Sequence, residues 1–206
     1  MTDSRTPGAS VAGGHAAIGE PSRWVRGWAH LVESGGAVLD VASGAGRHAR
    51  YFASRGHPVT AIDRDAAALA SMEGIAGLET IAADIENGPW PIAAHARFAA
   101  IVVTNYLHRP LFPQLIDALA PGGVLVYETF AQGNETVGKP SNPHFLLAPG
   151  ELLDVVRGLL RVVAFQDGFL AEPRPAYVQR ICAIREGDGA VRTKDMGLPP
   201  RYDLAG

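Results

Sequence analysis

A glycine-rich turn follows the first apolar stretch of the chain and has the residue types of a ligand-binding loop. Residues 37–42 read AVLDVA, and Ser43-Gly44-Ala45-Gly46 follow before a helical pattern that runs to about Ser54. Glycines permit a tight turn and let a ligand lie against bare backbone, while the first turn of a helix offers unpaired N–H groups to it. Because a plain strand–helix turn also contains such glycines, the turn alone does not establish a binding site.

Three aspartates lie at or near the ends of successive expected strands. Asp40 lies inside the first strand, where a buried carboxylate needs a cation or a hydrogen-bond donor, and it suits a ligand ammonium or a water held beside one. Asp63 ends the second strand, where an acid commonly accepts hydrogen bonds from a ribose diol. Asp84 follows the third strand and is placed to contact an adenine amino group. Each aspartate alone also fits a solvated loop acid, but three beside one glycine turn indicate a nucleoside-containing ligand.

Apolar runs and helical patterns alternate along most of the chain. Strands are expected at residues 37–42, 59–62, 78–82, 98–104, 124–129, 160–166 and 177–184, and helices at residues 21–31, 47–54, 65–73, 110–120 and 150–157. Such alternation predicts a mostly parallel sheet with helices on both faces, and two final strands without a helix between them predict an antiparallel hairpin. The expected fold class is α/β, a single doubly wound sheet of seven strands with one antiparallel strand. Ligands of such sheets bind beyond the carboxyl ends of the strands.

The composition fits one globular domain. Hydrophobic residues make up 47% and charged residues 19% of the 206 positions, and 24 glycines with 15 prolines fall short of a low-complexity chain. Residues 1–20 are small and polar, and we expect them to form a flexible leader. Residues 21–186 are expected to form the domain and residues 187–206 a peripheral tail.

Charge and cysteine content exclude several kinds of partner. A net charge of −3 argues against a nucleic-acid partner, and the single cysteine, Cys182, cannot form an internal disulfide or a multi-thiolate zinc site. We therefore expect no metal. No apolar run approaches the ~18–20 residues that cross a bilayer, and the N-terminus lacks the pattern of a signal peptide. A cytoplasmic protein without membrane association is expected, and it is compatible with a monomer or a homodimer.

Residues 38–65, VLDVASGAGRHARYFASRGHPVTAIDRD, resemble the first two motifs of class I S-adenosylmethionine-dependent methyltransferases. They are similar in particular to small bacterial tellurite-resistance-type methyltransferases, and the resemblance extends from about Trp24 to Arg185. It includes the turn Ala120-Pro121-Gly122-Gly123. The shared pattern after the glycine turn consists of Gly46, Arg47, Ala53, Gly56 and Val59.

The resemblance implies a Rossmann-like class I methyltransferase domain with S-adenosyl-L-methionine as its cofactor. Ala42 and Ala45 depart from the family pattern, in which relatives often have Gly and Thr, Ser or Asn, but both changes are small for small. The implied cofactor-binding residues are Asp40, Ser43, Gly44 and Gly46 at the methionine end, Asp63 at the ribose, Arg64, Asp84 and Ile85 at the adenine, and Thr104 after the fourth strand.

A small molecule is the expected methyl acceptor, because the domain leaves little sequence for recognising a macromolecule. A thiolate or another soft anion needs no base, whereas an alcohol, amine or carbon acid needs a proton acceptor near the methyl group. The candidate catalytic residues are His108 as a base, Tyr106 in the pocket wall and Glu128 at the end of the fifth strand; His108 also fits a helix cap. Residues 132–147 are expected to form a lid that Phe145 and Leu146 seal, or a plain surface excursion.

Two other functions fit parts of the pattern. Residues 44–49 also match GxGxxA, and with Asp63 they fit an NAD(P)-dependent oxidoreductase, although Asp40 and the final strand pair argue against it. A non-catalytic sensor or partner subunit that binds S-adenosylmethionine also fits, because no residue is an unmistakable catalytic base.

Overall fold

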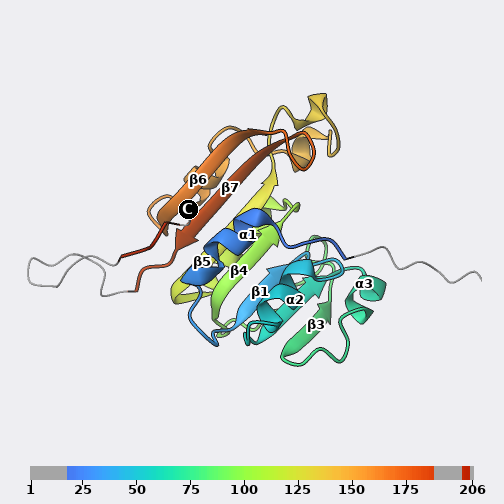
Figure 1. The fold of residues 1–206 in the computed structure, drawn as a ribbon, viewed down its shortest axis with the longest axis vertical. Helices are drawn as coiled ribbons and strands as arrows, with labels where there is room; N and C mark the ends of the chain where they lie inside the picture. The colour runs from blue at the N-terminus through green and yellow to red at the C-terminus, as the bar shows by residue number, and fades with distance from the viewer. Residues whose placement is uncertain (1–17, 188–200, 205–206) are drawn as a thin grey trace, which may run out of the picture.

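The structure of the chain is a computed structural model, and it describes residues 18–187 and 201–204. The described residues form one sheet in the order β3-β2-β1-β4-β5-β7-β6 (Figure 1). Its strands are β1 (Val38–Val41), β2 (Val59–Asp63), β3 (Leu78–Ala82), β4 (Phe98–Thr104), β5 (Leu119–Phe130), β6 (Arg161–Leu170) and β7 (Ala176–Ile184). Strand β7 is antiparallel to β5 and β6, and the other neighbouring strands pair in parallel.

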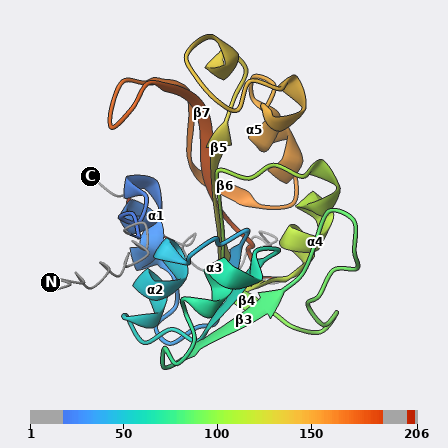
Figure 2. The ribbon, with the colours of Figure 1, turned by 90° about the vertical axis from the view of Figure 1, so that its right-hand side faces the viewer.

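Helices cover both faces of the sheet. They are α1 (Arg23–Trp28), α2 (Arg47–Ala53), α3 (Ala66–Ala70), α4 (Phe112–Asp117) and α5 (Glu151–Val156), with short 3₁₀ helices η1 (Ala29–Leu31), η2 (Arg109–Leu111), η3 (Asn134–Thr136) and η4 (Pro143–Phe145). Figure 2 shows α1 and α2 on one face and α4 and α5 on the other. Two apolar clusters fill the space between the sheet and the helices, one on each face. Strand β4 is apolar along its length because both of its faces are buried: Val102 belongs to one cluster and Val103 to the other.

The predicted fold class is confirmed. The described sheet has seven strands, is doubly wound and mostly parallel, and carries one antiparallel strand with helices on both faces. The bounds of β3 and β4 agree with the predicted ones, whereas β6 and β7 are longer than expected. The extra length arises because Phe169 pairs with Tyr177 and Leu170 with Ala176, which shortens the connection to residues 171–175.

The prediction of a helix over residues 110–120 is wrong at its C-terminal end. Helix α4 ends at Asp117, and the Pro121–Gly123 segment lies inside β5 rather than stopping a helix. The Ala118 carbonyl accepts a hydrogen bond from the Phe98 N–H at 2.9 Å, so the chain has joined the sheet before the glycines begin. A register shift between Phe98 and Ala100 then accommodates them.

The predicted division into leader, domain and tail stays a prediction, because residues 1–17, 188–200 and 205–206 lie outside the described residues. The described part of the tail contacts the domain: Tyr202 packs against the apolar cluster on the α1 face, and the His30 ring lies 2.9 Å from the Asp203 carbonyl oxygen. Within the described ranges, no helix combines the length and the hydrophobicity that crossing a membrane requires.

Candidate cofactor and acceptor site

The glycine turn joins β1 to α2 at the carboxyl edge of the sheet. The Gly44 N–H donates to Asp63 Oδ2 at 2.7 Å, so the turn is tied to the end of β2. Gly46 begins α2 with a φ of +74°, and a Cβ at this position would lie 1.8 Å from Met72 Sδ. Only glycine combines that backbone conformation with that close approach. The first residue of the turn, Ala42, also has a positive φ of +53°, which is strained for alanine.

Asp40 is the buried acid of this turn. Its Oδ2 accepts a hydrogen bond from the Ala49 N–H at 2.9 Å, and burial raises the pKa of its carboxyl group from 3.8 to about 7. A cation that arrived beside it would favour the charged form. The nearby Ser43 hydroxyl is buried and has no hydrogen-bond partner. The turn therefore holds a carboxyl group and a hydroxyl that the described chain leaves available to a ligand.

The acids after β2 and β3 have different local roles. Asp63 Oδ1 accepts from the Asp65 N–H at 2.9 Å, and each of its carboxylate oxygens keeps a further acceptor position. Asp84 instead closes a tight turn, since its carboxylate accepts from the Glu86 and Asn87 N–H groups and from the Asn87 side chain. The Asn87 side chain and these backbone bonds lower the pKa of Asp84. Asp84 therefore fixes the positions of Ile85 and Glu86.

A cavity of about 290 Å³ extends along these strand ends. Its wall contains all four residues predicted for the ribose and adenine, together with Ala42, which precedes the glycine turn. The lining residues are Ala42, Asp63, Arg64, Ala83, Asp84, Ile85, Glu86, Tyr106 and Phe145. Asp40, Ser43, Gly44 and Gly46, which were predicted for the methionine end, lie outside this wall, and so does Thr104, which was also predicted to bind the cofactor.

A second cavity of about 250 Å³ adjoins the first over the ends of β4 and β5. The two share Glu86, Tyr106 and Phe145, and the remaining walls are Asn105, Leu107, Thr129, Phe130 and Pro140. A ligand in one cavity would therefore lie beside a ligand in the other.

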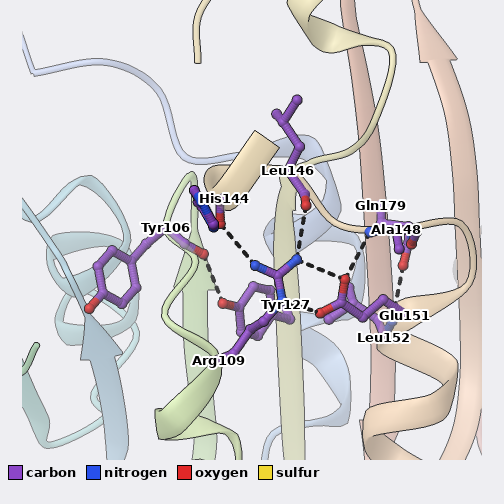
Figure 3. A network of polar contacts seen from close by, with 9 residues as sticks. All are labelled: Tyr106, Arg109, Tyr127, His144, Leu146, Ala148, Glu151, Leu152 and Gln179. Carbon is purple, nitrogen blue, oxygen red and sulfur yellow. Dashed lines mark hydrogen bonds and ion pairs between the residues drawn. The ribbon is translucent and has the colours of Figure 1, made fainter. Parts of the chain in front are cut away.

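Tyr106 stands between the two cavities. Its carbonyl oxygen accepts a hydrogen bond from the Tyr127 hydroxyl at 2.8 Å, and Figure 3 shows its ring directed away from Tyr127. The Tyr106 hydroxyl is buried without a hydrogen-bond partner, and burial, followed by the charge of Glu86, raises its pKa. The phenol therefore stays protonated near neutral pH and can donate to a ligand.

An arginine clamp holds the segment predicted to be a lid. The Arg109 guanidinium donates to the His144 and Leu146 carbonyl oxygens, each at 2.9 Å, and pairs with Glu151 at 2.7 Å (Figure 3). Glu151 Oε2 also accepts from the Ala148 N–H at 2.8 Å. The clamp fixes η4, whose last residue, Phe145, lines both cavities.

The other lid residues serve the loop itself. The Asn134 side chain donates to the Pro140 carbonyl and accepts from the Tyr177 N–H, and Asn142 accepts from the His144 N–H. Leu146 is buried in a small cluster with Phe130 and contributes to neither cavity wall.

Two of the predicted catalytic residues, Glu128 and His108, and the predicted cofactor-binding residue Thr104 lie outside both cavity walls. Glu128 pairs with Arg180 at 2.8 Å and accepts from the Ser22 hydroxyl at 2.9 Å, which links β5, β7 and the start of α1. His108 precedes η2 and makes no capping hydrogen bond with its side chain.

Thr104 belongs to a network around the buried His48. The Thr104 hydroxyl lies 3.5 Å from His48 Nδ1 and 3.4 Å from an Arg47 nitrogen, and the Ser22 N–H donates to His48 Nε2. Burial lowers the pKa of His48 from 6.5 to about 3, so the ring is neutral near pH 7. The network connects the carboxyl edge of the sheet to the segment that precedes α1.

Sequence reasoning missed Glu86, Arg109 and Glu151. A helix pattern that begins near Gly150 does not reveal that Glu151 pairs with a residue 42 positions earlier. Glu86 could have been found, because an aspartate followed three positions later by asparagine is a turn signal that fixes the residues between them.

The arrangement has the strand order and edge site of the class I S-adenosylmethionine-dependent methyltransferases. A family profile described as "Methyltransferase domain" matches residues 38–123, from β1 into β5. Residues 38–123 are therefore similar to a methyltransferase domain, and structures of the same fold with bound S-adenosylhomocysteine support the predicted cofactor, S-adenosylmethionine. No curated protein has a significantly similar sequence.

Solved structures share the fold at low sequence identity. TehB from Haemophilus influenzae has a TM-score of 0.61 and 20% identity over 77% of this chain, and the match spans only 60% of that protein. A TehB-like methyltransferase from Corynebacterium glutamicum has a TM-score of 0.58 and 17% identity over 79% of this chain and 87% of that one. The N-methyltransferase NodS from Bradyrhizobium japonicum has a TM-score of 0.59 and 19% identity over 80% of this chain and 95% of that one. The predicted resemblance to the tellurite-resistance type is thus confirmed at the level of the fold.

Proposed function

We propose that this chain transfers a methyl group from S-adenosylmethionine to a small-molecule acceptor bound in the second cavity. The observation that carries the proposal is the pair of adjoining cavities, which share Glu86, Tyr106 and Phe145 at the carboxyl edge of the sheet. Their volumes of about 290 and 250 Å³ suit small ligands rather than a polymer.

The residues present fit the cofactor. The carboxylate of Asp63 has free acceptor positions for ribose hydroxyls, and Arg64, Asp84 and Ile85 form the walls next to it. The unpartnered Ser43 hydroxyl and the buried Asp40, with Gly44 and Gly46 nearby in the chain, suit the polar methionine end. The Thr104 hydroxyl lies 3.4 Å from an Arg47 nitrogen, at the start of the helix that follows the turn. When bound, the cofactor supplies an electrophilic methyl group on a positively charged sulfur.

The chain's own contribution to the reaction is alignment and exclusion of water. Methyl transfer is an in-line displacement, so holding the acceptor in the second cavity against the first supplies most of the required geometry. Phe145 and Tyr106 form an aromatic cover between the cavities, and the Tyr106 hydroxyl is free to donate a hydrogen bond. His108 and Glu128 lie outside both walls, so of the predicted catalytic residues Tyr106 is the one that lines the second cavity.

Calorimetric titration with S-adenosylhomocysteine and with NAD tests the cofactor assignment. We expect the first to bind and the second not to bind. Asp63→Asn should weaken S-adenosylhomocysteine binding by about tenfold or more, since a hydrogen bond to a charged group contributes about 1.5–3 kcal/mol. Asp65→Asn is the matched control, because Asp65 caps α3 and lies outside the cavity wall.

Transfer of a labelled methyl group to a panel of small acceptors tests the activity. Turnover that is lost in Asp63→Asn and kept in Asp65→Asn supports the proposal. Binding of NAD without S-adenosylhomocysteine would overturn it in favour of an oxidoreductase. Tight S-adenosylhomocysteine binding without turnover of any acceptor would favour a non-catalytic sensor or partner subunit.

A further inference from the structure

The second cavity has a distinctive wall. Tyr106, Phe130 and Phe145 supply aromatic rings, Leu107 and Pro140 add apolar surface, and the polar groups are Glu86, Asn105 and Thr129. Among the described residues that line this cavity, one is a carboxylate and none is a lysine, arginine or histidine.

Glu86 is the carboxylate that the described chain leaves without an ionic partner at this site. Among residues 18–187 and 201–204 it forms no ion pair, whereas Glu128 pairs with Arg180 and Glu151 with Arg109. Its backbone is nevertheless fixed, because its N–H donates to Asp84 Oδ1 at 3.0 Å. Glu86 thus carries its negative charge on a turn that Asp84 closes, and its side chain lines both cavities.

The surroundings reinforce this negative charge. Asp63 and Asp84 line the adjoining cavity, where Arg64 is the single basic residue of the wall. The Arg174 guanidinium lies 5.8 Å from the ring centroid of Phe130 but belongs to neither wall. An anionic acceptor in the second cavity would meet Glu86 with no opposite charge in the wall, which disfavours it. A cationic group would gain from the carboxylate and from the faces of the aromatic rings.

We propose, building on the function proposed above, that the acceptor is a small molecule bearing an amine. Glu86 attracts its ammonium form, and Tyr106, Phe130 and Phe145 enclose the group that carries the nitrogen. The ammonium releases one proton to water before transfer, since the reacting nitrogen must offer its lone pair. A nitrogen–carbon bond then forms as the carbon–sulfur bond breaks, and the breaking bond's electron pair stays on sulfur. The products are a neutral thioether and a methylated ammonium, which is in protonation equilibrium with water.

The test compares acceptors of similar size and different charge on the full-length chain. Labelled methyl transfer is measured for benzylamine, phenylacetate, benzyl mercaptan and selenite, and binding of benzylamine and phenylacetate to the protein saturated with S-adenosylhomocysteine is measured in parallel. We expect methyl transfer to benzylamine to be faster than transfer to phenylacetate or to selenite by about tenfold or more.

Substitution of the carboxylate gives the sharper result. Glu86→Gln should raise the KM for benzylamine by about fivefold to tenfold. The S-adenosylhomocysteine dissociation constant should change less, although Glu86 also lines the first cavity. Glu79→Gln is the matched control, because Glu79 is exposed on β3 and lies in neither wall. Higher salt should weaken the preference of the wild type for the amine, because salt screens an exposed charge.

Three outcomes overturn the proposal. They are a preference for phenylacetate or selenite, an unchanged benzylamine KM in Glu86→Gln, and failure of the amine to bind or react while S-adenosylhomocysteine binds normally. Failure of the wild type to bind S-adenosylhomocysteine would instead refute the proposed function itself, so the two failures are distinguishable.

Discussion

The two halves of the sheet hold their parts of the site by different means. Around β1, β2 and β3, aspartate carboxylates accept hydrogen bonds from backbone N–H groups. Some of these bonds close short turns, such as the Asp84 turn, whose bonds span two or three residues, while the Asp40–Ala49 and Gly44–Asp63 bonds span 9 and 19 residues. Around β4, β5 and β7, side-chain contacts between distant residues hold the segments of the site in place. Arg109 and Glu151, for example, are 42 residues apart. The contacts of a short turn can be inferred from its own sequence, whereas a contact between distant residues, such as the Arg109 clamp, cannot. The half with the proposed cofactor cavity is accordingly easier to infer from sequence than the half with the proposed acceptor cavity.

The largest effect should come from filling the space at Gly46. In Gly46→Ala, the new Cβ would approach Met72 Sδ and Cε while the backbone has a positive φ. Overpacking costs about 1–3 kcal/mol and the left-handed conformation about 1–2 kcal/mol, so we expect a loss of roughly 2–5 kcal/mol. Chemical denaturation measures it.

Gly44→Ala is the matched control for that substitution. Gly44 has a similar φ of +54°, but a Cβ there would meet no atom within 4 Å. Only the conformational penalty of about 1–2 kcal/mol should remain. Equal losses in the two variants would show that the Met72 contact is unimportant.

Asp40 should give the turn a pH-dependent stability. Its pKa is about 7 in the folded chain and 3.8 as the ordinary value, so the folded state binds the proton more tightly. Asp40 therefore contributes most to the free energy of unfolding at low pH. This contribution falls as the pH rises from about 4 to about 7, by up to about 4 kcal/mol. Asp40→Asn lacks this loss and should be more stable than the wild type at pH 8, with the difference vanishing near pH 4.

The comparison with Asp40→Asn also removes a competing effect. The lowered pKa of His48 contributes a loss of stability as pH falls below about 6.5, but it is common to both proteins and cancels in the difference. Unfolding free energies measured from pH 4 to pH 8 check the sign. A difference that grows toward low pH would contradict a buried, uncharged Asp40.

Removing one partner of the Glu128–Arg180 pair should cost about 3 kcal/mol, because both side chains are largely buried and Arg180 would keep its charge without a partner. Glu128→Gln makes this change. The control is Asp154→Asn, which breaks the exposed pair with Arg157 and should change stability by less than about 1 kcal/mol. A large loss of activity in Glu128→Gln without a loss of stability would instead support the predicted catalytic role of Glu128.

The features that could be predicted from the sequence lie mostly in the half of the sheet around β1, β2 and β3. The glycine turn, the succession of strands along the chain and the positions of Asp63 and Asp84 were inferred from local patterns, because turn chemistry and strand periodicity depend on neighbouring residues. The carboxylate of Asp84 was nonetheless assigned to adenine, while its described bonds all close its own turn. Local pattern located the residue without showing how its lone pairs are used.

In the acceptor half, the sequence indicated a long loop and two apolar seals but not what holds them. Phe145 lines both cavities because Arg109 binds the two carbonyl groups that flank it, and Leu146 turns into a separate cluster. Neither outcome follows from periodicity, since each depends on which distant residue packs against the loop. Long-range pairing requires the assembled fold before it can be inferred.

The Arg109 clamp can be loosened without removing its charge. Arg109→Lys keeps a cation near Glu151 but loses the planar fork that reaches the His144 and Leu146 carbonyl groups. We expect a local loss of about 1–2 kcal/mol, seen as faster hydrogen exchange over residues 142–148. The acceptor KM should rise more than the S-adenosylhomocysteine dissociation constant. Arg97→Lys is the control, because its guanidinium bonds only to the neighbouring Ala94 and Ala96 carbonyl groups.

The smallest expected effect is a gain of stability in the cofactor half. Ala42 has a φ of +53°, where alanine is strained and glycine is not, so Ala42→Gly should stabilise the chain by about 0.5–1 kcal/mol after the entropy of the unfolded state is counted. Ala45→Gly is the control, since Ala45 has no positive φ and should lose about 0.5 kcal/mol. Denaturation midpoints of both variants measure the difference. If Ala42→Gly is also destabilising, the Ala42 methyl group in the cavity wall contributes packing that outweighs its strained backbone, and the turn is less local than its sequence implies.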